Sequence, residues 1–289
     1  MATDPVFLAQ LAANGLSVGL GYALAAIGLA LLFGILGQVN FAHGELYMLG
    51  AFLLLWGMTR LGLPYGVGAV LMVFVLAGFG ALLAQVVIVP NLARGFESVV
   101  LGTLAVGIIL QNAVRLGFGA TPLDITSPFE GSAFDIGGVL VFGQRLLVAA
   151  VFVVAFSALW AFLRHTEIGR AMRATSQNRE ACVMVGIDVN RVARWTGALA
   201  AGLTGLAGVV IAPLFDLYPN MGTEVVIKSF AVVIIGGMGS LGGAAIGALL
   251  VGLADNFGKA LFPEVSYFNL YAPMALILAI KPTGLFGRE

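Results

Sequence analysis

The feature that most limits the possible folds of this chain is a run of forty residues without a charge. Residues 5–44 contain no Asp, Glu, Lys or Arg. The run is about twice the ~20 apolar residues that carry a helix across a bilayer core. Only 10% of the 289 residues are charged and 60% are hydrophobic, whereas charged residues make up about 25% of a soluble domain. We therefore predict a polytopic membrane protein.

The apolar segments are long enough for helices and too long for barrel strands. Transmembrane strands would appear as alternating segments of about ten residues, and lipid leaves every backbone polar group to be paired within the protein. We predict an all-α membrane fold of about eight spans in one domain, residues 1–289. The predicted spans are residues 14–37, 41–58, 64–90, 98–118, 137–163, 195–215, 227–254 and 265–280.

Basic residues indicate which side of the membrane a loop faces. Six of the fourteen Lys and Arg residues fall between residues 164 and 194. This segment is predicted to be cytoplasmic, because Lys and Arg accumulate in cytoplasmic loops. Counting back from it puts the N-terminus and residues 119–136 outside. The side of the C-terminus stays open, because eight crossings would leave Lys281 and Arg288 outside unless the seventh span is re-entrant.

Glycine is about twice as frequent as usual, with 40 of 289 residues. In the seventh predicted span Gly239, Gly243 and Gly247 recur every fourth residue, with Gly236 beside them. Small residues at this spacing let helices pack closely in lipid. The same stretch, GGMGSLGG, could instead break the helix. Both interpretations are open at the level of sequence.

The cytoplasmic segment 164–194 is too short for a catalytic domain and is predicted to act on a partner. Asn178 is expected to cap a short helix, Gly186 to end it in the left-handed conformation, and Asp188 to cap the next helix. The small residues Ala181 and Cys182 would enter a groove of the partner, with arginines at the rim. The alternative is a solvated connector whose arginines only set the topology.

Three stretches, one of which contains a recognisable loop motif, together resemble one family of membrane proteins. Residues 180–186, EACVMVG, are similar to the Glu-Ala-Ala-x-x-x-Gly loop by which permeases of ABC importers dock their ATPase. NFAHGELYMLGAF, IGRAMRATSQNREACVMVGID and VIIGGMGSLGGAAIGALLVG resemble segments of LivH-type permeases of branched-chain amino-acid importers. Cys182 replaces the second Ala of the wider pattern. The Ile-x-Leu-Pro that follows in many importers is absent, and Trp195 stands near the place of its Ile.

The resemblance implies an inner-membrane permease subunit of an ATP-driven importer, without enzyme activity of its own. The implied partners are a second permease subunit of LivM type, two cytoplasmic ATPase subunits that bind ATP and magnesium, and an extracytoplasmic substrate-binding protein. The implied coupling residues are Arg170, Arg173, Arg179, Glu180, Ala181, Cys182 and Gly186. The path is expected to be apolar and lined by glycine. Branched-chain amino acids are the implied substrates, with urea or short amides as the alternative.

We predict no cofactor or metal site in the chain itself. In GLADNFGKA, residues 252–260, five residues separate the first glycine from Gly-Lys and Ala260 follows, whereas a phosphate-binding loop has four and then Ser or Thr. His43 and Glu45 lack the Pro-Cys-x-x-Cys partner of zinc deaminases, because Cys182 is the only cysteine. The net charge of zero predicts no nucleic-acid partner, so the remaining surface is expected to contact membrane lipid.

The stretch QVNFAHGELYMLG, residues 38–50, places Asn40, His43 and Glu45 at the junction of the first two spans. We expect this junction at the cytoplasmic side, within reach of water. Asn40 could cap the second span, or the three residues could line an inward gate. Direct substrate binding is the weakest interpretation. A His–Glu proton relay would instead suit a proton-coupled secondary transporter, and a scaffold that only assembles through its glycines is a third hypothesis.

Two further polar pairs lie in apolar spans. Gln111 and Asn112, in the fourth span, are candidates to line the path or to form hydrogen bonds between helices. Asp255 and Asn256 are expected at the cytoplasmic end of the seventh span, where they would be interfacial anchors.

Overall fold

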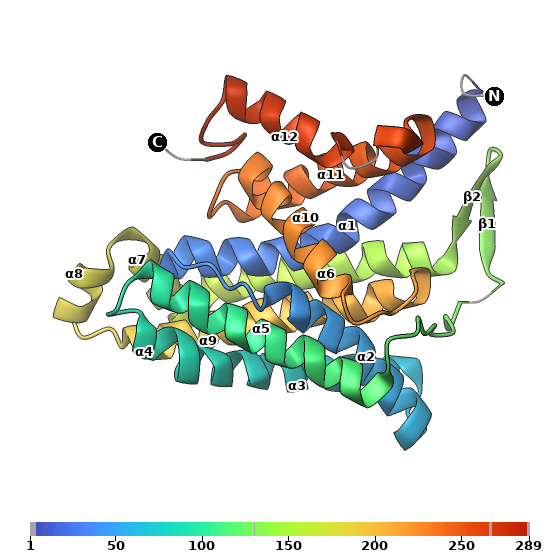
Figure 1. The fold of residues 1–289 in the computed structure, drawn as a ribbon. Helices are drawn as coiled ribbons and strands as arrows, with labels where there is room; N and C mark the ends of the chain where they lie inside the picture. Colours follow the sequence, from blue (N-terminus) through green and yellow to red (C-terminus); the bar gives the residue numbers. More distant parts are fainter. Residues whose placement is uncertain (1–3, 130, 266–267, 288–289) are drawn as a thin grey trace.

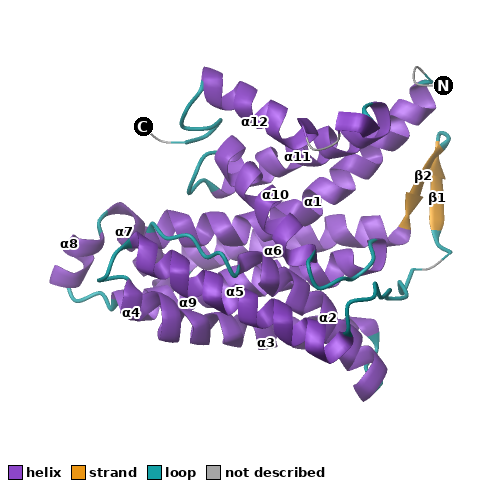
Figure 2. Cartoon of the chain, viewed as in Figure 1, coloured by secondary structure: helices purple, strands orange, loops and turns teal. Residues whose placement is uncertain are grey.

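The computed structural model describes residues 4–129, 131–265 and 268–287, which form a helical bundle with one β-hairpin (Figure 1, Figure 2). The α-helices are α1 (Pro5–Leu36), α2 (His43–Leu61), α3 (Tyr65–Leu83), α4 (Val89–Asn91), α5 (Phe96–Phe118), α6 (Gly143–His165), α7 (Glu167–Gln177), α8 (Arg179–Met184), α9 (Val189–Ile211), α10 (Met221–Gly236), α11 (Leu241–Leu261) and α12 (Phe268–Ile280). The π-helical turn η1 (Ala84–Ile88) joins α3 to α4, and η2 (Ala212–Leu214) and η3 (Pro263–Val265) are 3-10 turns. Strands β1 (Ala133–Ile136) and β2 (Val139–Phe142) are antiparallel.

The all-α polytopic membrane fold is confirmed, although the count of eight spans is only approximate. Six helices in the described chain are long and apolar enough to cross a membrane. They are α1, α3 continued to Asn91, α5, α6, α9 continued to Leu214, and α11. The predicted fifth span began too early, because residues 139–142 form strand β2 and α6 begins at Gly143. Helix α1 begins earlier than predicted, where the Asp4 side chain accepts a hydrogen bond from the Val6 backbone N–H (3.0 Å).

The two ends of the bundle differ in character. Helices α7 and α8 project at one end, and the β1–β2 hairpin and the N-terminus lie at the other (Figure 1). The arginine-rich α7–α8 end is cytoplasmic by the positive-inside rule. Residues after α12 return to that end, because Leu285 N–H donates to the Ile235 carbonyl (2.8 Å) and Phe286 N–H to the Gly236 carbonyl (3.0 Å). The chain after α12, with Lys281, is therefore on the cytoplasmic side; Arg288 lies outside the described residues.

The predicted seventh span is two helices, which corrects the expectation of one continuous span over 227–254. Helix α10 ends at Gly236 and α11 begins at Leu241. The chain turns between them with Gly237 and Gly239 at φ values of 102° and 83°, a region that side chains disfavour. The predicted stripe is therefore divided, because Gly236 ends α10, Gly239 lies in the turn, and only Gly243 and Gly247 share α11. Gly236 and Gly243 face each other across the turn, and Gly247 packs on the Val232 carbonyl.

The chain between α1 and α2 returns into the bundle. His43, the first residue of α2, contacts the carbonyl of Ala25, which lies roughly three turns, or about 16 Å, before the end of α1. Residues 37–42 are extended or turn-like in between. Helix α2 therefore starts near the middle of the membrane. The polar junction was expected at the cytoplasmic side and is instead buried, because the re-entrant segment carries it inward.

Helices α1–α3 and α9–α11 form two halves of opposite direction. Helix α1 lies antiparallel to α11, where Gly19 packs on Ala248, as α9 lies antiparallel to α3, where Gly197 packs on Gly80. Helices α2 and α10 meet at the centre. Helix α10, like α2, starts inside the bundle after a returning loop, residues 215–220. This arrangement is an inverted repeat, an architecture of many transporters.

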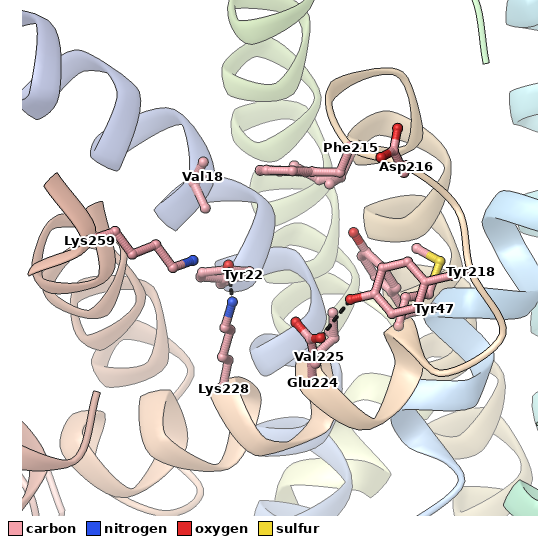
Figure 3. A pocket seen from close by; sticks show the side chains of 12 residues that line it. Val18, Tyr22, Tyr47, Phe215, Asp216, Tyr218, Glu224, Val225, Lys228 and Lys259 are labelled. Carbon is pink, nitrogen blue, oxygen red and sulfur yellow. Dashed lines mark hydrogen bonds between the residues drawn. The ribbon is translucent and has the colours of Figure 1, made fainter. Parts of the chain in front are cut away.

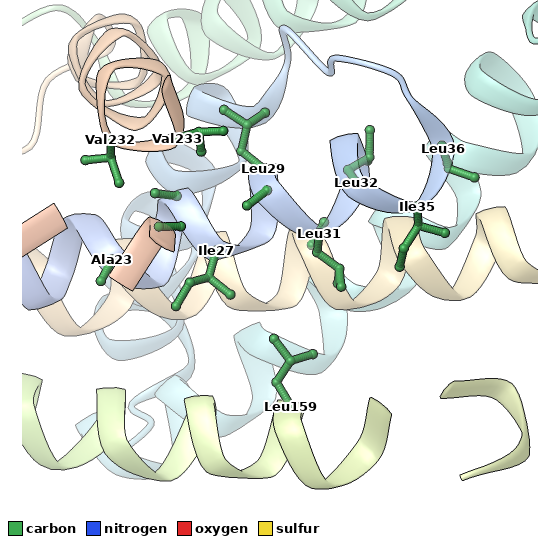
Figure 4. Close-up of a cluster of buried hydrophobic side chains, with 14 of the residues drawn as sticks. Ala23, Ile27, Leu29, Leu31, Leu32, Ile35, Leu36, Leu159, Val232 and Val233 are labelled. Carbon is green, nitrogen blue, oxygen red and sulfur yellow. The ribbon is translucent and has the colours of Figure 1, made fainter. Parts of the chain in front are cut away.

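Helix α1 is the centre of the apolar core. Leu29 and Leu32 of α1 are almost fully buried and pack among Leu159 of α6 and Val232 and Val233 of α10 (Figure 4). The outer faces of other helices are apolar too, as illustrated by Phe74 of α3, Leu116 of α5 and Val154 of α6, which are 71%, 88% and 68% exposed. An apolar exterior of this kind fits lipid or another membrane helix.

Candidate functional site

The imidazole of His43 is held inside the bundle by α1 and α9. Its Nε2 lies 2.8 Å from the Ala25 carbonyl and 2.8 Å from Thr204 Oγ1, and the residue is fully buried. A carbonyl can only accept, so Nε2 carries the hydrogen. Thr204 itself donates to the Ala200 carbonyl (2.8 Å). His43 therefore joins three helices, which is a structural role that the sequence did not indicate.

Glu45 lies two residues further along α2 and faces a different neighbourhood. Its Oε1 accepts a long hydrogen bond from the Thr223 hydroxyl (3.5 Å). Its Oε2 is buried without a hydrogen-bond partner among the described residues. Gly107 of α5 and Gly222 of α10 lie against the same side chain. Glu45 is thus a buried carboxyl group at the meeting point of α2, α5 and α10.

The predicted His43–Glu45 relay is not formed in this structure. The two side chains bind different partners, because residues two apart on a helix do not face each other.

The re-entrant segment is fixed by two side chains. Asn40 Oδ1 accepts from the Ala42 backbone N–H (2.9 Å). Ala42 is itself the N-cap of α2, and α2 has no side-chain cap hydrogen bond, so Asn40 does not cap this helix as considered. Phe41 N–H donates to Thr103 Oγ1 of α5 (3.1 Å). Thr103 is fully buried and had no distinguishing sequence signal. The first bond shapes the turn before α2, and the second attaches that turn to α5.

Gln111 and Asn112 are not brought into this polar centre as a pair. Asn112 is exposed, and its Nδ2 donates to the Ile108 carbonyl of its own helix (2.8 Å), so it forms neither a buried site nor a bond between helices. Gln111 is half-buried and lies one turn beyond Gly107 on α5. Of the two, only Gln111 lies on the same face of α5 as Gly107, which contacts Glu45.

The cytoplasmic projection has the predicted helix-turn-helix form. Asn178 Oδ1 accepts from the Ala181 N–H (2.9 Å), and Asp188 Oδ1 accepts from the Arg191 N–H (3.0 Å). Gly186 has φ 82°. These caps confirm the three local predictions, because each depends on backbone geometry within a few residues.

The groove-entering face of α8 was predicted on the wrong side. Cys182 is buried against the protein's own α7–α9 region and Ala181 is half-buried. The exposed tip instead consists of Val183, Met184 and Val185, which are 61%, 81% and 75% exposed. Cys182 lies on the face of α8 that packs against α7 and α9, whereas residues 183–185 lie at the free end of the helix. An exposed run of apolar residues on a polar loop was the available sequence signal.

The charged residues of the projection surround this tip. Arg170 pairs with Glu167 (3.7 Å) and Arg194 with Asp188 (3.9 Å), both exposed to water. Arg173 and Glu180 are exposed and Arg179 is half-buried. Exposed pairs of this kind contribute little to stability, so these side chains are available to a partner.

The comparisons with known proteins cover almost the entire chain. The family described as branched-chain amino acid transport system / permease component matches residues 11–279. The chain belongs to this family. The permease is 32% identical to the high-affinity branched-chain amino acid transport system permease protein BraD of Pseudomonas aeruginosa, over 98% of this chain and 96% of that protein.

Two further relatives extend the comparison. The permease is 30% identical to the high-affinity branched-chain amino acid transport system permease protein LivH of Escherichia coli, over 100% of this chain and 98% of that protein. It is 29% identical to the ribose import permease protein RbsC of Escherichia coli, over 64% of this chain and 60% of that protein. The resemblance inferred from sequence motifs is therefore confirmed, and so is a multi-pass membrane location.

Proposed function

We propose that the permease forms part of the transmembrane path of an ATP-driven importer of branched-chain amino acids. The observation that carries the proposal is the capped, apolar tip of residues 183–185 at the arginine-rich end of an inverted-repeat membrane bundle. A connector that only set the topology would have no reason to present Met184 to water, since burying apolar surface is favourable. The full-length relatives BraD and LivH support the substrate class.

The tip and its arginines suit a cytoplasmic ATPase as the partner. Val183, Met184 and Val185 would enter an apolar groove, while Arg173, Arg179 and Glu180 would form rim contacts. The ATPase subunits would bind ATP and magnesium. A second permease subunit would complete the path, and an external binding protein would deliver substrate at the hairpin end.

Movement of the tip can reach the membrane helices through α7. Met172 of α7 is fully buried in the α1 core, so α7 and α1 move together. A cavity of about 130 Å³ lies beside this contact, lined among others by Gly34 of α1, Arg173 of α7 and Gly239 of the α10–α11 turn. It gives α7 room to shift relative to the turn. A shift there would move α10 and thereby the Gly222 side of the polar centre around Glu45.

A pull-down with matched variants tests the proposal. Met184→Asp should abolish co-purification of the ATPase, because a charge would be buried in the docked groove. Gln177→Asp adds the same charge on the exposed end of α7 and should leave co-purification unchanged. Equal recovery of the ATPase with both variants would contradict docking through the tip.

A further inference from the structure

A second polar site lies near the external end of the permease, separate from the Glu45 centre. A cavity of about 260 Å³ is lined by residues of α1, α2, α9, α10, α11 and the loop after η2. Phe215, Asp216 and Lys259 are exposed at its mouth, and Tyr22 and Tyr47 are buried at its floor. The volume is a little below the roughly 300–1,000 Å³ of pockets for drug-sized ligands. The cavity therefore suits a smaller molecule.

One side of the cavity is positively charged. Lys228 and Lys259 both approach the same oxygen of Asp255, Oδ2, at 3.4 and 3.0 Å. Lys228 also donates to the Tyr22 hydroxyl (2.8 Å). The side chain of Asp255 is 10% exposed, which corrects its expected role as a cytoplasmic interfacial anchor. The break at 237–240 reverses the direction of α11, so Asp255 lies toward the external end. Two ammonium groups share one carboxylate, and one positive charge is left over.

A negatively charged group lies on the same wall of the cavity, one helical turn from Lys228 on α10. Glu224 Oε1 accepts from the Tyr218 hydroxyl (2.6 Å). Among the salt bridges of the described residues, none involves Glu224 or Asp216. Glu224 and Lys228 are four apart on α10, a spacing at which such residues often pair. Here Lys228 points to Tyr22 and Glu224 to Tyr218 (Figure 3). The two charged groups therefore bind different partners and do not pair with each other, although they are neighbours on α10.

We infer that this cavity binds the zwitterionic head of an α-amino acid with an aliphatic side chain. The ligand carboxylate would contact Lys228 and Lys259, and its ammonium group would contact Glu224. The Cβ atoms of residues four apart on a helix are about 5–6 Å apart, so groups carried on one carbon of the ligand can reach both poles. Val18, Ile211 and Val225 line the same cavity and would receive the aliphatic chain. The translocation path would therefore contain a charged substrate site near its external end, whereas the sequence led us to expect an apolar path.

This inference rests on the proposed import function and names a site for its substrate. The test uses the assembled complex in nanodiscs, without ATP and without binding protein, with radiolabelled L-leucine as the probe. Saturable binding is expected, and Glu224→Gln should weaken it by about tenfold or more, because the paired charge is lost while the Tyr218 hydrogen bond can remain. Glu97→Gln, at the exposed cytoplasmic start of α5, is the matched control and should bind as the unmodified complex does.

Competition experiments define which part of the ligand is recognised. Unlabelled L-leucine should displace the probe, whereas 4-methylpentanoate and isoamylamine, which each lack one charge, should compete at least about tenfold less well. Leucine affinity that is unchanged by Glu224→Gln, or equal competition by the singly charged analogues, would overturn the inference. ATP-driven leucine uptake by a complex that shows no saturable leucine binding would also overturn it, and would leave the import function standing. Saturable leucine binding without uptake would instead count against the import function.

Discussion

Gly44 near the start of α2 and Gly222 near the start of α10 are packed backbone against backbone, so that a methyl group on Gly44 would overlap the Gly222 carbonyl. Helices α2 and α10, the second helix of each half of the inverted repeat, meet at this point, directly beside Glu45. The contact has no room for any side chain. It therefore links the packing of the two halves to the position of the buried carboxyl group.

Gly44→Ala is expected to destabilise the permease. Overpacking of a tight contact costs about 1–3 kcal/mol, and here the opposing group is backbone, which cannot rotate away. The melting temperature in detergent should fall by several degrees. Gly78→Ala is the matched control, because Gly78 also lies within a helix but has nothing within 4 Å of the added methyl group. An equal effect of both substitutions would show that the Gly44–Gly222 contact is not tight in solution.

The chain's two histidines offer a second test. His43→Ala removes two hydrogen bonds and leaves a buried void, which together should cost about 2–4 kcal/mol. The folded yield in detergent should drop accordingly. His165→Ala, at the exposed end of α6, should have no effect within about 0.5 kcal/mol. If His43→Ala reduced transport with no loss of stability, His43 would act in the path and not as a link between helices.

Local features such as helix caps could be predicted from the sequence, but the depth at which a segment lies in the membrane bundle could not. The caps at Asn178 and Asp188 and the turn at Gly186 followed from residues within one helical turn. No local signal reported that residues 37–42 return into the bundle, because that depends on contacts with Thr103 and α9. The inverted repeat left a weak trace in the sequence, since Asn40 and Asn220 each precede a Gly and a Glu near the start of α2 and α10.

The break between α10 and α11 was missed, and this affected the predicted position of Asp255. Treating residues 227–254 as one span assigned Asp255 to the cytoplasmic end, whereas the turn at Gly237 and Gly239 reverses the chain. Glycine is suited both to the positive φ values of a turn and to close packing between helices. The glycine pattern alone therefore could not distinguish a break in the helix from a packing stripe.

The Gly186 turn provides a prediction about coupling. Gly186→Val should prevent the ATPase from being retained, because a β-branched residue strongly disfavours φ 82° and would change the position of the 183–185 tip. Gly186→Asn is the control, because Asn tolerates the left-handed region and should keep most of the association. Co-purification with both variants at similar permease yield is the measurement. Normal retention of the ATPase by Gly186→Val would mean that the turn does not position the tip.

The next prediction concerns Asp255, which pairs with Lys228 and Lys259 near the external end. Asp255→Asn would leave Lys228, whose side chain is 17% exposed, without its anionic partner. Removing one partner of a buried pair costs about 3–5 kcal/mol, and the partial exposure of this cluster reduces that to about 1–3 kcal/mol. Thermal unfolding in detergent should show the loss. Asp135→Asn, on the exposed β1 strand, should leave the unfolding temperature unchanged, and equal curves for the two variants would contradict a stabilising role of Asp255.

The most direct test of the account is ATP-driven leucine uptake by proteoliposomes that contain the complete complex and its binding protein, with the proton gradient collapsed by an ionophore. Uptake should persist in the unmodified complex. It should fall with Glu45→Gln, which changes the charge at the meeting point of α2, α5 and α10, while ATPase co-purification stays normal. Uptake that stops when the proton gradient is collapsed, or proton-driven uptake by this chain alone, would contradict an ATP-driven importer.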